Sequence, residues 1–227
     1  MDARELMALG PVLPVVVLDD AARAVPLAKA LLAGGVRTME VTLRTPAALA
    51  GIERITAEVP ELVVGAGTVV APAQAERAVA AGARFLVSPG SPPALLDAML
   101  AQGVPVLPGV ATVTEVLTLL ERGLTEMKFF PAEAGGGAAF LRALAGPLPQ
   151  ARFCPTGGIT ADNLARYLAL STVPCAGGSW LTPAPLVARG DWAELTRLAA
   201  LVGNPPLAAR PPHSEQTRPP GRSQRRS

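Results

Sequence analysis

The chain has 227 residues, half of them hydrophobic, and a formal net charge of +2. This length suits one well-buried domain, and the apolar content excludes a fibrous or wholly disordered chain. Residues 204–227 hold five Arg and one Glu, so the remaining 15 Lys plus Arg and 17 Asp plus Glu leave residues 1–203 slightly acidic. We therefore expect one domain over 1–203 and a disordered Pro- and Arg-rich tail over 204–227, with no role in binding nucleic acid.

The N-terminal segment predicts neither a signal peptide nor a membrane span. Two acids and one Arg precede the first apolar run, and Pro11 and Pro14 interrupt that run. The two cysteines, Cys154 and Cys175, lie in apolar, strand-like segments without a CxxC motif or a His partner. We therefore expect a cytoplasmic protein with two buried, reduced thiols.

After a short leading helix at about 2–9, apolar runs of strand length alternate with Ala- and Leu-rich segments of helical period. The predicted strands are 13–18, 38–43, 63–68, 85–88, 105–108, 126–130, 152–155 and 173–176. The predicted helices begin near Asp20, Pro46, Pro72, Pro92, Thr112, Gly137, Thr160 and Pro183, and several of these are residues that favour helix N-termini. Many helices are followed by Gly at a position typical of a left-handed C-cap: Gly34 and Gly35, Gly82, Gly103 and Gly123.

Eight such units in about 200 residues favour a single (β/α)8 TIM barrel over a doubly wound open sheet, although the pattern alone excludes neither. In a barrel of this kind the functional groups lie where the strands end and the βα loops begin. The polar and glycine residues at those positions are Glu40, Thr42, Arg44, Thr68, Ser88, Lys128, Thr156, Gly157, Gly158, Gly177, Gly178 and Ser179.

Lys128 is one of only two lysines in the chain. The other, Lys29, lies in an amphipathic helical segment, where a solvent-facing side chain is expected. Lys128 lies in a predicted strand, where Met127 and Phe129 would face the helix layer and leave the lysine inside the barrel. Partial desolvation there disfavours the ammonium and favours a nucleophilic amine that forms Schiff bases. The alternative from position alone is a structural lysine paired with Glu40 or Glu133.

Glu40 and Arg44 belong to a strand in which alternate residues face the same side. Glu40, Thr42 and Arg44 would therefore point inward together. Glu40 is suited to general acid/base chemistry near the lysine, and the Arg44 guanidinium is suited to a substrate carboxylate. A structural ion pair is the alternative for these two residues, but it gives no reason for the lysine.

Two Gly-Gly segments follow the seventh and eighth predicted strands, where barrels of this type commonly bind phosphate. They are Gly157–Gly158 and Gly177–Gly178, and glycines there let backbone N–H groups approach an anion. Ser179 adds a hydroxyl donor. These segments predict a phosphate site.

The motifs GGVRTMEVTLRT, VGAGTV, SPG, KFFPAE, RFCPTGGI and GGSWL resemble, in order and spacing over about residues 6–200, those of the KDPG/KHG aldolase family. The resemblance implies that Lys128 is the Schiff-base lysine and Glu40 the general acid/base. It assigns Arg44 and Thr68 to the pyruvate portion of the substrate. The remaining pocket and phosphate positions that it implies are Pro89, Phe130, Thr156, Gly157, Gly158, Gly178 and Ser179.

The resemblance further implies a class I aldolase that cleaves 2-keto-3-deoxy-6-phosphogluconate to pyruvate and glyceraldehyde 3-phosphate, and also 4-hydroxy-2-oxoglutarate. It implies a homotrimer. We expect no cofactor and no metal, because the single His213 lies in the tail and no carboxylate/His cluster is visible.

Three alternatives remain open at the level of the sequence. The first is an aldolase specific for the galactonate epimer of the substrate, which would share the lysine. The second is a sugar-phosphate isomerase or epimerase barrel, which would need the phosphate loops but no imine on Lys128. The third is a phosphosugar-binding barrel without catalytic activity.

Overall fold

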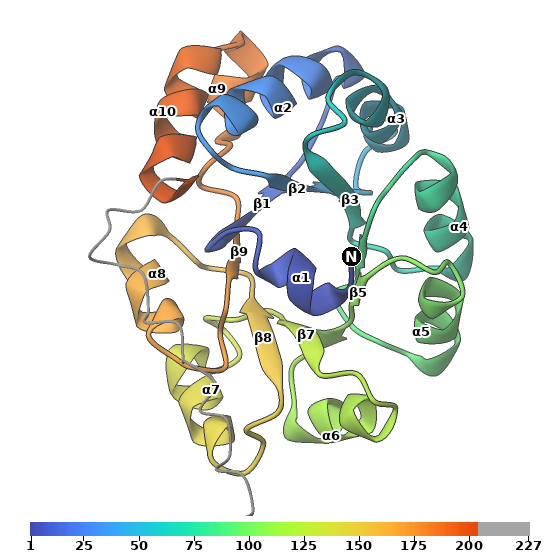
Figure 1. The fold of residues 1–227 in the computed structure, drawn as a ribbon, viewed down its shortest axis with the longest axis vertical. Helices are drawn as coiled ribbons and strands as arrows, with labels where there is room; N and C mark the ends of the chain where they lie inside the picture. The colour runs from blue at the N-terminus through green and yellow to red at the C-terminus, as the bar shows by residue number, and fades with distance from the viewer. Residues whose placement is uncertain (204–227) are drawn as a thin grey trace, which may run out of the picture.

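The computed structural model describes residues 1–203, so the tail predicted for 204–227 and His213 lie outside the described residues. Within residues 1–203, the longest helices fall short of the length and apolarity that crossing a membrane would require. Strands and helices alternate along the described chain, and the helices surround the strands (Figure 1). The expected α/β class is therefore confirmed.

All strand pairs between the named strands are parallel and form two sheets. The strands are β1 (Val12–Val16), β2 (Thr38–Thr42), β3 (Val63–Gly67), β4 (Leu86–Val87), β5 (Val106–Leu107), β6 (Gly109–Val110), β7 (Glu126–Phe129), β8 (Arg152–Pro155) and β9 (Ala176–Gly178). One sheet has the order β5-β4-β3-β2-β1-β9, and the other has the order β6-β7-β8. An isolated parallel bridge between Thr156 and Gly177 connects the ends of β8 and β9.

In the view of Figure 1 the strands are arranged in a ring, and the helices lie outside it. The exception is α1 (Ala3–Met7), which lies across the centre of this ring. The outer helices are α2 (Ala24–Ala33), α3 (Ala48–Glu58), α4 (Pro72–Ala80), α5 (Pro93–Leu100), α6 (Val113–Glu121), α7 (Gly137–Ala145), α8 (Ala161–Leu168), α9 (Ala184–Arg189) and α10 (Trp192–Gly203). A short 3-10 helix, η1 (Ala21–Arg23), directly precedes α2. As expected, Gly35, Gly82, Gly103 and Gly123 have the positive φ of left-handed C-cap residues.

The α1 helix covers the end of the ring where the strands begin. Leu6 and Met7 are buried and belong to one apolar cluster with Leu13 of β1 and Val63 of β3. Two larger clusters fill the space between the strands and the outer helices. Because α1 occupies the N-terminal end of the strands, the opposite end is the one left for a ligand.

Most of the predicted strands differ from the observed ones by a few residues at their ends, and in two of them a proline explains the difference. The strand predicted at 105–108 ends early, because Pro108 has no N–H to donate; β5 pairs with β4 before it and β6 pairs with β7 after it. The strand predicted at 173–176 begins only at Ala176, whose N–H donates to Pro11 O at 3.0 Å, because Pro174 likewise lacks a donor.

The helix predicted from Pro183 is two helices. Pro183 is the N-cap of α9, and that helix ends at Gly190, which has a φ of 71°. A left-handed residue cannot continue an α-helix, so the chain turns and starts again as α10 at Trp192. The α10 helix then packs against α2, as Figure 1 shows.

Candidate active site

Most of the predicted site residues lie at one end of the ring. Because the paired strands are parallel, their C-terminal ends lie on the same side of the sheets. Several predicted site residues come directly after a strand: Thr68 after β3, Phe130 after β7, Thr156 after β8 and Ser179 after β9. Segments that are far apart in the sequence thus converge on one face.

Lys128 and Glu40 meet inside the ring. Lys128 Nζ donates to Glu40 Oε1 at 3.3 Å, and the two residues are 4% and 1% exposed. The lysine comes from β7 in one sheet and the glutamate from β2 in the other, so the contact crosses the interior. A buried ammonium next to a buried carboxylate provides a direct path for a proton to leave the amine.

The surroundings of both residues follow the strand alternation predicted from the sequence. Met127 and Phe129, the neighbours of Lys128, are fully buried against side chains of α6 and α7. Met39 and Val41, which flank Glu40, are likewise buried in the layer between strands and helices. The inward direction of the lysine and the glutamate is therefore confirmed. Of the two acidic partners considered for Lys128, Glu40 and Glu133, Glu40 is the one that it contacts.

Gly67 provides the space in which the Glu40 carboxylate lies. A Cβ atom added to Gly67 would lie 1.9 Å from Glu40 Oε1 and 2.4 Å from its Cγ. The Glu40 side chain thus lies against β3 at Gly67, where there is no space for a side chain on the strand. The sequence gives no direct signal for this contact, because a glycine in a strand has several possible causes.

Arg44 and Thr68 differ in how the structure places them. The β2 strand ends at Thr42, so the strand alternation does not extend to Arg44, which lies in a turn and is exposed. Thr68 is half-buried with a φ of 57°, the only residue other than glycine with a positive φ in the described chain. For a β-branched residue this conformation is strained, and such strain is concentrated at functional sites.

Pro89 lies at the edge of this face, beside the polar end of β4. Ser88 is fully buried, and its Oγ accepts a 3.3 Å hydrogen bond from Gly109 N. A Cβ atom on Gly109 would lie 2.2 Å from the carbonyl carbon of Pro89. The close packing of Gly109 thus fixes the Pro89 backbone against β6.

Phe130 connects the lysine to the first glycine loop. Lys128 Nζ lies 5.4 Å from the centroid of the Phe130 ring, within the range of a cation–π contact. Atoms of the same ring lie 3.3 Å from the position that a Cβ of Gly157 would take. The peptide bond from Phe130 to Pro131 is cis. The ring therefore lies beside both the Lys128 amine and the glycine loop.

The two predicted phosphate loops lie side by side. The bridge between Thr156 and Gly177 joins them, and a Cβ on Gly177 would lie 2.2 Å from Thr156 Oγ1. Gly157 and Gly158 have φ values of 102° and 79°. Gly178 is buried and Ser179 exposed. Glycine adopts positive φ values at no steric cost, and a loop without side chains lets an anion approach its backbone N–H groups.

Glu133 and Tyr167, neither of them predicted as site residues, lie next to the first glycine loop. Tyr167 Oη donates to Glu133 Oε1, and Arg166 lies 3.6 Å from Glu133 Oε2. Glu133 N donates to Gly157 O at 3.0 Å. Glu133 is the last residue of the motif KFFPAE, and Tyr167 is the only tyrosine in the chain. That single occurrence is the one sequence signal that could have drawn attention to it.

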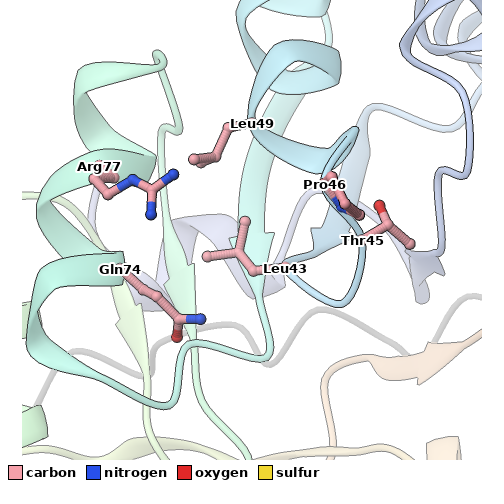
Figure 2. Close-up of a pocket in the computed structure, with 6 residues that line it drawn as sticks. All are labelled: Leu43, Thr45, Pro46, Leu49, Gln74 and Arg77. Carbon is pink, nitrogen blue, oxygen red and sulfur yellow. The ribbon is translucent and has the colours of Figure 1, made fainter.

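A surface cavity of about 220 Å³ lies on another part of the molecule, between α3 and α4. Figure 2 shows Gln74 and Arg77 of α4 facing Leu43 and Leu49 across it. None of the predicted site residues lines this cavity. Among residues 1–203, no three His, Cys, Asp or Glu side chains gather in the way that a protein metal site requires.

Comparisons with known proteins identify a family for this chain. The family model "KDPG and KHG aldolase" matches residues 3–198. The KHG/KDPG aldolase of Escherichia coli (strain K12) is 51% identical over 197 residues, which are 87% of this chain and 92% of that protein.

Two solved structures are similar to the chain. The Legionella pneumophila KDPG aldolase, which holds pyruvate as a covalent carbinolamine intermediate, has a TM-score of 0.87 at 44% identity and covers 89% of this chain and 98% of its own. The Zymomonas mobilis ZM4 enzyme with 3-phosphoglycerate has a TM-score of 0.83 at 47% identity, covering 88% and 93%. The chain thus belongs to the KDPG and KHG aldolase family.

Proposed function

We propose that this chain is a class I aldolase that cleaves 2-dehydro-3-deoxy-6-phosphogluconate to pyruvate and glyceraldehyde 3-phosphate through an imine on Lys128. The observation that carries the proposal is the buried contact of Lys128 with Glu40. The only other lysine, Lys29, is exposed on α2. The covalent carbinolamine in the Legionella pneumophila relative supports the same chemistry here.

The first step forms the imine. The Lys128 ammonium gives a proton to the Glu40 carboxylate 3.3 Å away, and the free amine attacks the C2 ketone. The resulting carbinolamine loses water to give the protonated imine. Glu40 returns the proton that this loss requires and is then a carboxylate again.

The second step breaks the C3–C4 bond. Glu40 accepts the proton of the C4 hydroxyl, directly or through a water, and the bond electrons move into the imine to give an enamine. Glyceraldehyde 3-phosphate leaves as the C4 oxygen becomes its aldehyde. Glu40 then returns its proton to C3, directly or through a water, and hydrolysis of the resulting pyruvate imine frees pyruvate and Lys128.

The other proposed site residues hold the two ends of the substrate. Arg44 and Thr68 contact the pyruvate carboxylate, and Pro89 and Phe130 line the pocket. Thr156, Gly157, Gly158, Gly178 and Ser179 bind the phosphate through backbone N–H and hydroxyl groups. The 3-phosphoglycerate in the Zymomonas mobilis structure supports a phosphate subsite in this fold.

We also propose that the two sheets are arcs of one closed (β/α)8 barrel. The strand orders meet at Pro108, which separates β5 from β6, and at the bridge between Thr156 and Gly177. Residues 1–203 are then the catalytic unit, and it assembles as a homotrimer in the cytoplasm. The 4-hydroxy-2-oxoglutarate activity in the name of the Escherichia coli relative is the second substrate that we propose.

The test compares Lys128→Arg with Lys29→Arg, a matched pair because the chain has only these two lysines. Pyruvate release is measured from the gluconate and galactonate epimers and from 4-hydroxy-2-oxoglutarate. We expect Lys29→Arg to equal the parent and Lys128→Arg to lose all turnover, because a guanidinium does not form the imine. Full activity of Lys128→Arg would refute the mechanism, and preference for the galactonate epimer would correct the substrate.

A further inference from the structure

Tyr167 is a buried side chain whose polar end reaches the loop after β7. Its ring is fully buried in the apolar cluster that contains Leu141 and Leu144 of α7. Its hydroxyl donates to Glu133 Oε1. The proposed mechanism does not use this pair, although a buried hydroxyl bonded to a carboxylate is a strong, oriented contact.

Glu133 lies against the first glycine loop through both its backbone and its side chain. Ala132 N donates to Thr156 O at 2.8 Å, and Glu133 N donates to Gly157 O at 3.0 Å. A Cβ atom on Gly158 would lie 2.8 Å from both Cβ and Cγ of Glu133. The Glu133 backbone and the base of its half-exposed side chain are therefore in close contact with the segment 156–158.

The Tyr167 hydroxyl is the donor in the hydrogen bond with Glu133. Burial, together with the bond to Glu133 and the charge of that carboxylate, raises the pKa of Tyr167 well above its ordinary value. The phenol thus stays protonated and remains a donor at physiological pH. Arg166, at 3.6 Å from the other carboxylate oxygen, is an exposed partner that contributes little by comparison.

The geometry points to Tyr167 and Glu133 as positioning residues for the phosphate end of the substrate. Tyr167 fixes Glu133, and Glu133 holds the backbone of Gly157 and Gly158 in the conformation that directs its N–H groups at the phosphate. A loop held in its binding conformation loses less entropy when the anion binds. This inference rests on the proposed function, because it assumes that the loop binds the phosphate of the sugar acid.

The expected effect is specific to the phosphate. Phosphate contacts far from the C3–C4 bond act alike on ground state and transition state, so their loss raises KM and leaves kcat nearly unchanged. For Tyr167→Phe and Glu133→Gln we expect a rise in KM for the phosphorylated substrate of about tenfold to 150-fold, the range for a hydrogen bond to a charged group. Pyruvate has no phosphate, so the pyruvate concentration that half-saturates borohydride trapping on Lys128 stays constant.

The experiment measures both quantities in the full-length parent, Tyr167→Phe, Glu133→Gln, the double variant, and Arg166→Ala as the control that leaves the Tyr167 hydrogen bond intact. The double variant is expected to equal Glu133→Gln, because Tyr167 acts through Glu133. Melting curves establish that each variant is folded, and absorption of the single tyrosinate at alkaline pH reports the hydrogen bond in Glu133→Gln.

Three outcomes contradict the inference in different ways. An unchanged KM in both single variants would overturn it outright. A parallel rise in KM and in the pyruvate half-saturation would show general damage to the site rather than positioning of the phosphate loop. A parent that forms no pyruvate adduct would overturn the proposed function itself, and the positioning role with it.

Discussion

At the scale of single residues, the contact between Glu40 and Lys128 depends on what lies around it. Glu40 extends across β3 because Gly67 has no side chain, and Lys128 reaches it from the opposite sheet. Both residues are buried, so the nearest polar partner of each side chain is the other one. Two substitutions separate the acid/base role of Glu40 from its position.

The first is Glu40→Gln, which keeps the size of the side chain and removes the proton acceptor. We expect cleavage to fall by about 10²- to 10⁴-fold, the usual contribution of a general acid/base. The amide still accepts a hydrogen bond from Lys128, so the protein should remain folded in circular dichroism. Rates of pyruvate release test this, and parent-like turnover would show that another group moves the proton.

The second is Gly67→Ala, which places a methyl group where the Glu40 carboxylate lies. We expect the carboxylate to be displaced from Lys128 and kcat to fall by at least about tenfold, since a misplacement near 1 Å can cost about 10²-fold. Gly146→Ala is the matched control, because no atom lies within 4 Å of its added Cβ and its φ is −71°. Equal kcat values for the two variants would contradict the role of Gly67.

How far the sequence predicts the site differs from residue to residue. The alternation of strand residues correctly places Lys128 and Glu40 inside the ring, because both lie within strands. It does not determine the direction of Arg44, because β2 ends two residues before it. Glu133 and Tyr167 meet across 34 residues of sequence, and no local pattern encodes such a contact.

At the scale of elements, helix starts are predicted well, because their signals are local. The N-caps Asp20, Thr112, Thr160 and Pro183 all lie at the predicted positions. Strand ends are predicted less well, because pairing depends on partners elsewhere in the chain. Pro108 and Pro174 interrupt hydrogen bonding at positions where the apolar pattern continues.

The capping box at the start of α6 gives a prediction of pH dependence. Burial acts to raise the pKa of Glu115, but hydrogen bonds from Ala111 N and from the side chain and N–H of Thr112 lower it below its ordinary value. A depressed folded-state pKa stabilises the fold above the unfolded value of about 4.3, and this stabilisation is lost as pH falls through the folded value.

Glu115→Gln should therefore reduce the free energy of unfolding at neutral pH by about 1 kcal/mol or less, as capping interactions do. The difference from the parent should shrink below a pH of about 4. Urea unfolding at pH 7 and at low pH measures it. Glu121→Gln, on the same helix but without a cap hydrogen bond in residues 1–203, is the control. If the difference in the free energy of unfolding between the parent and Glu115→Gln grew as the pH falls, the prediction would be contradicted.

At the scale of the whole molecule, the family match and the fold cover nearly the same residues. The family model ends at 198 and the described structure at 203, the last residue of α10. The α10 helix packs closely on α2, where a Cβ on Gly34 would lie 2.4 Å from that of Ala199. Residues up to 203 therefore belong to the packed unit.

A chain that stops after Gly203 should have the same kcat/KM, melting temperature and assembly as the full chain. We expect both to sediment as trimers, because the site and the packed unit lie within residues 1–203. Sedimentation velocity and pyruvate release compare the two chains directly. Loss of activity or of assembly on truncation would assign residues 204–227 a role that the sequence analysis did not predict.

Imine formation on Lys128 is tested by borohydride reduction in the presence of pyruvate, followed by peptide mass mapping. Reduction converts the imine to a stable secondary amine on whichever lysine formed it, and Lys29 and Lys128 lie in separate peptides. We predict that an adduct forms on Lys128 alone, and that it does not form when pyruvate is left out. A Lys128 that stays unmodified under saturating pyruvate would contradict Schiff-base catalysis in this chain.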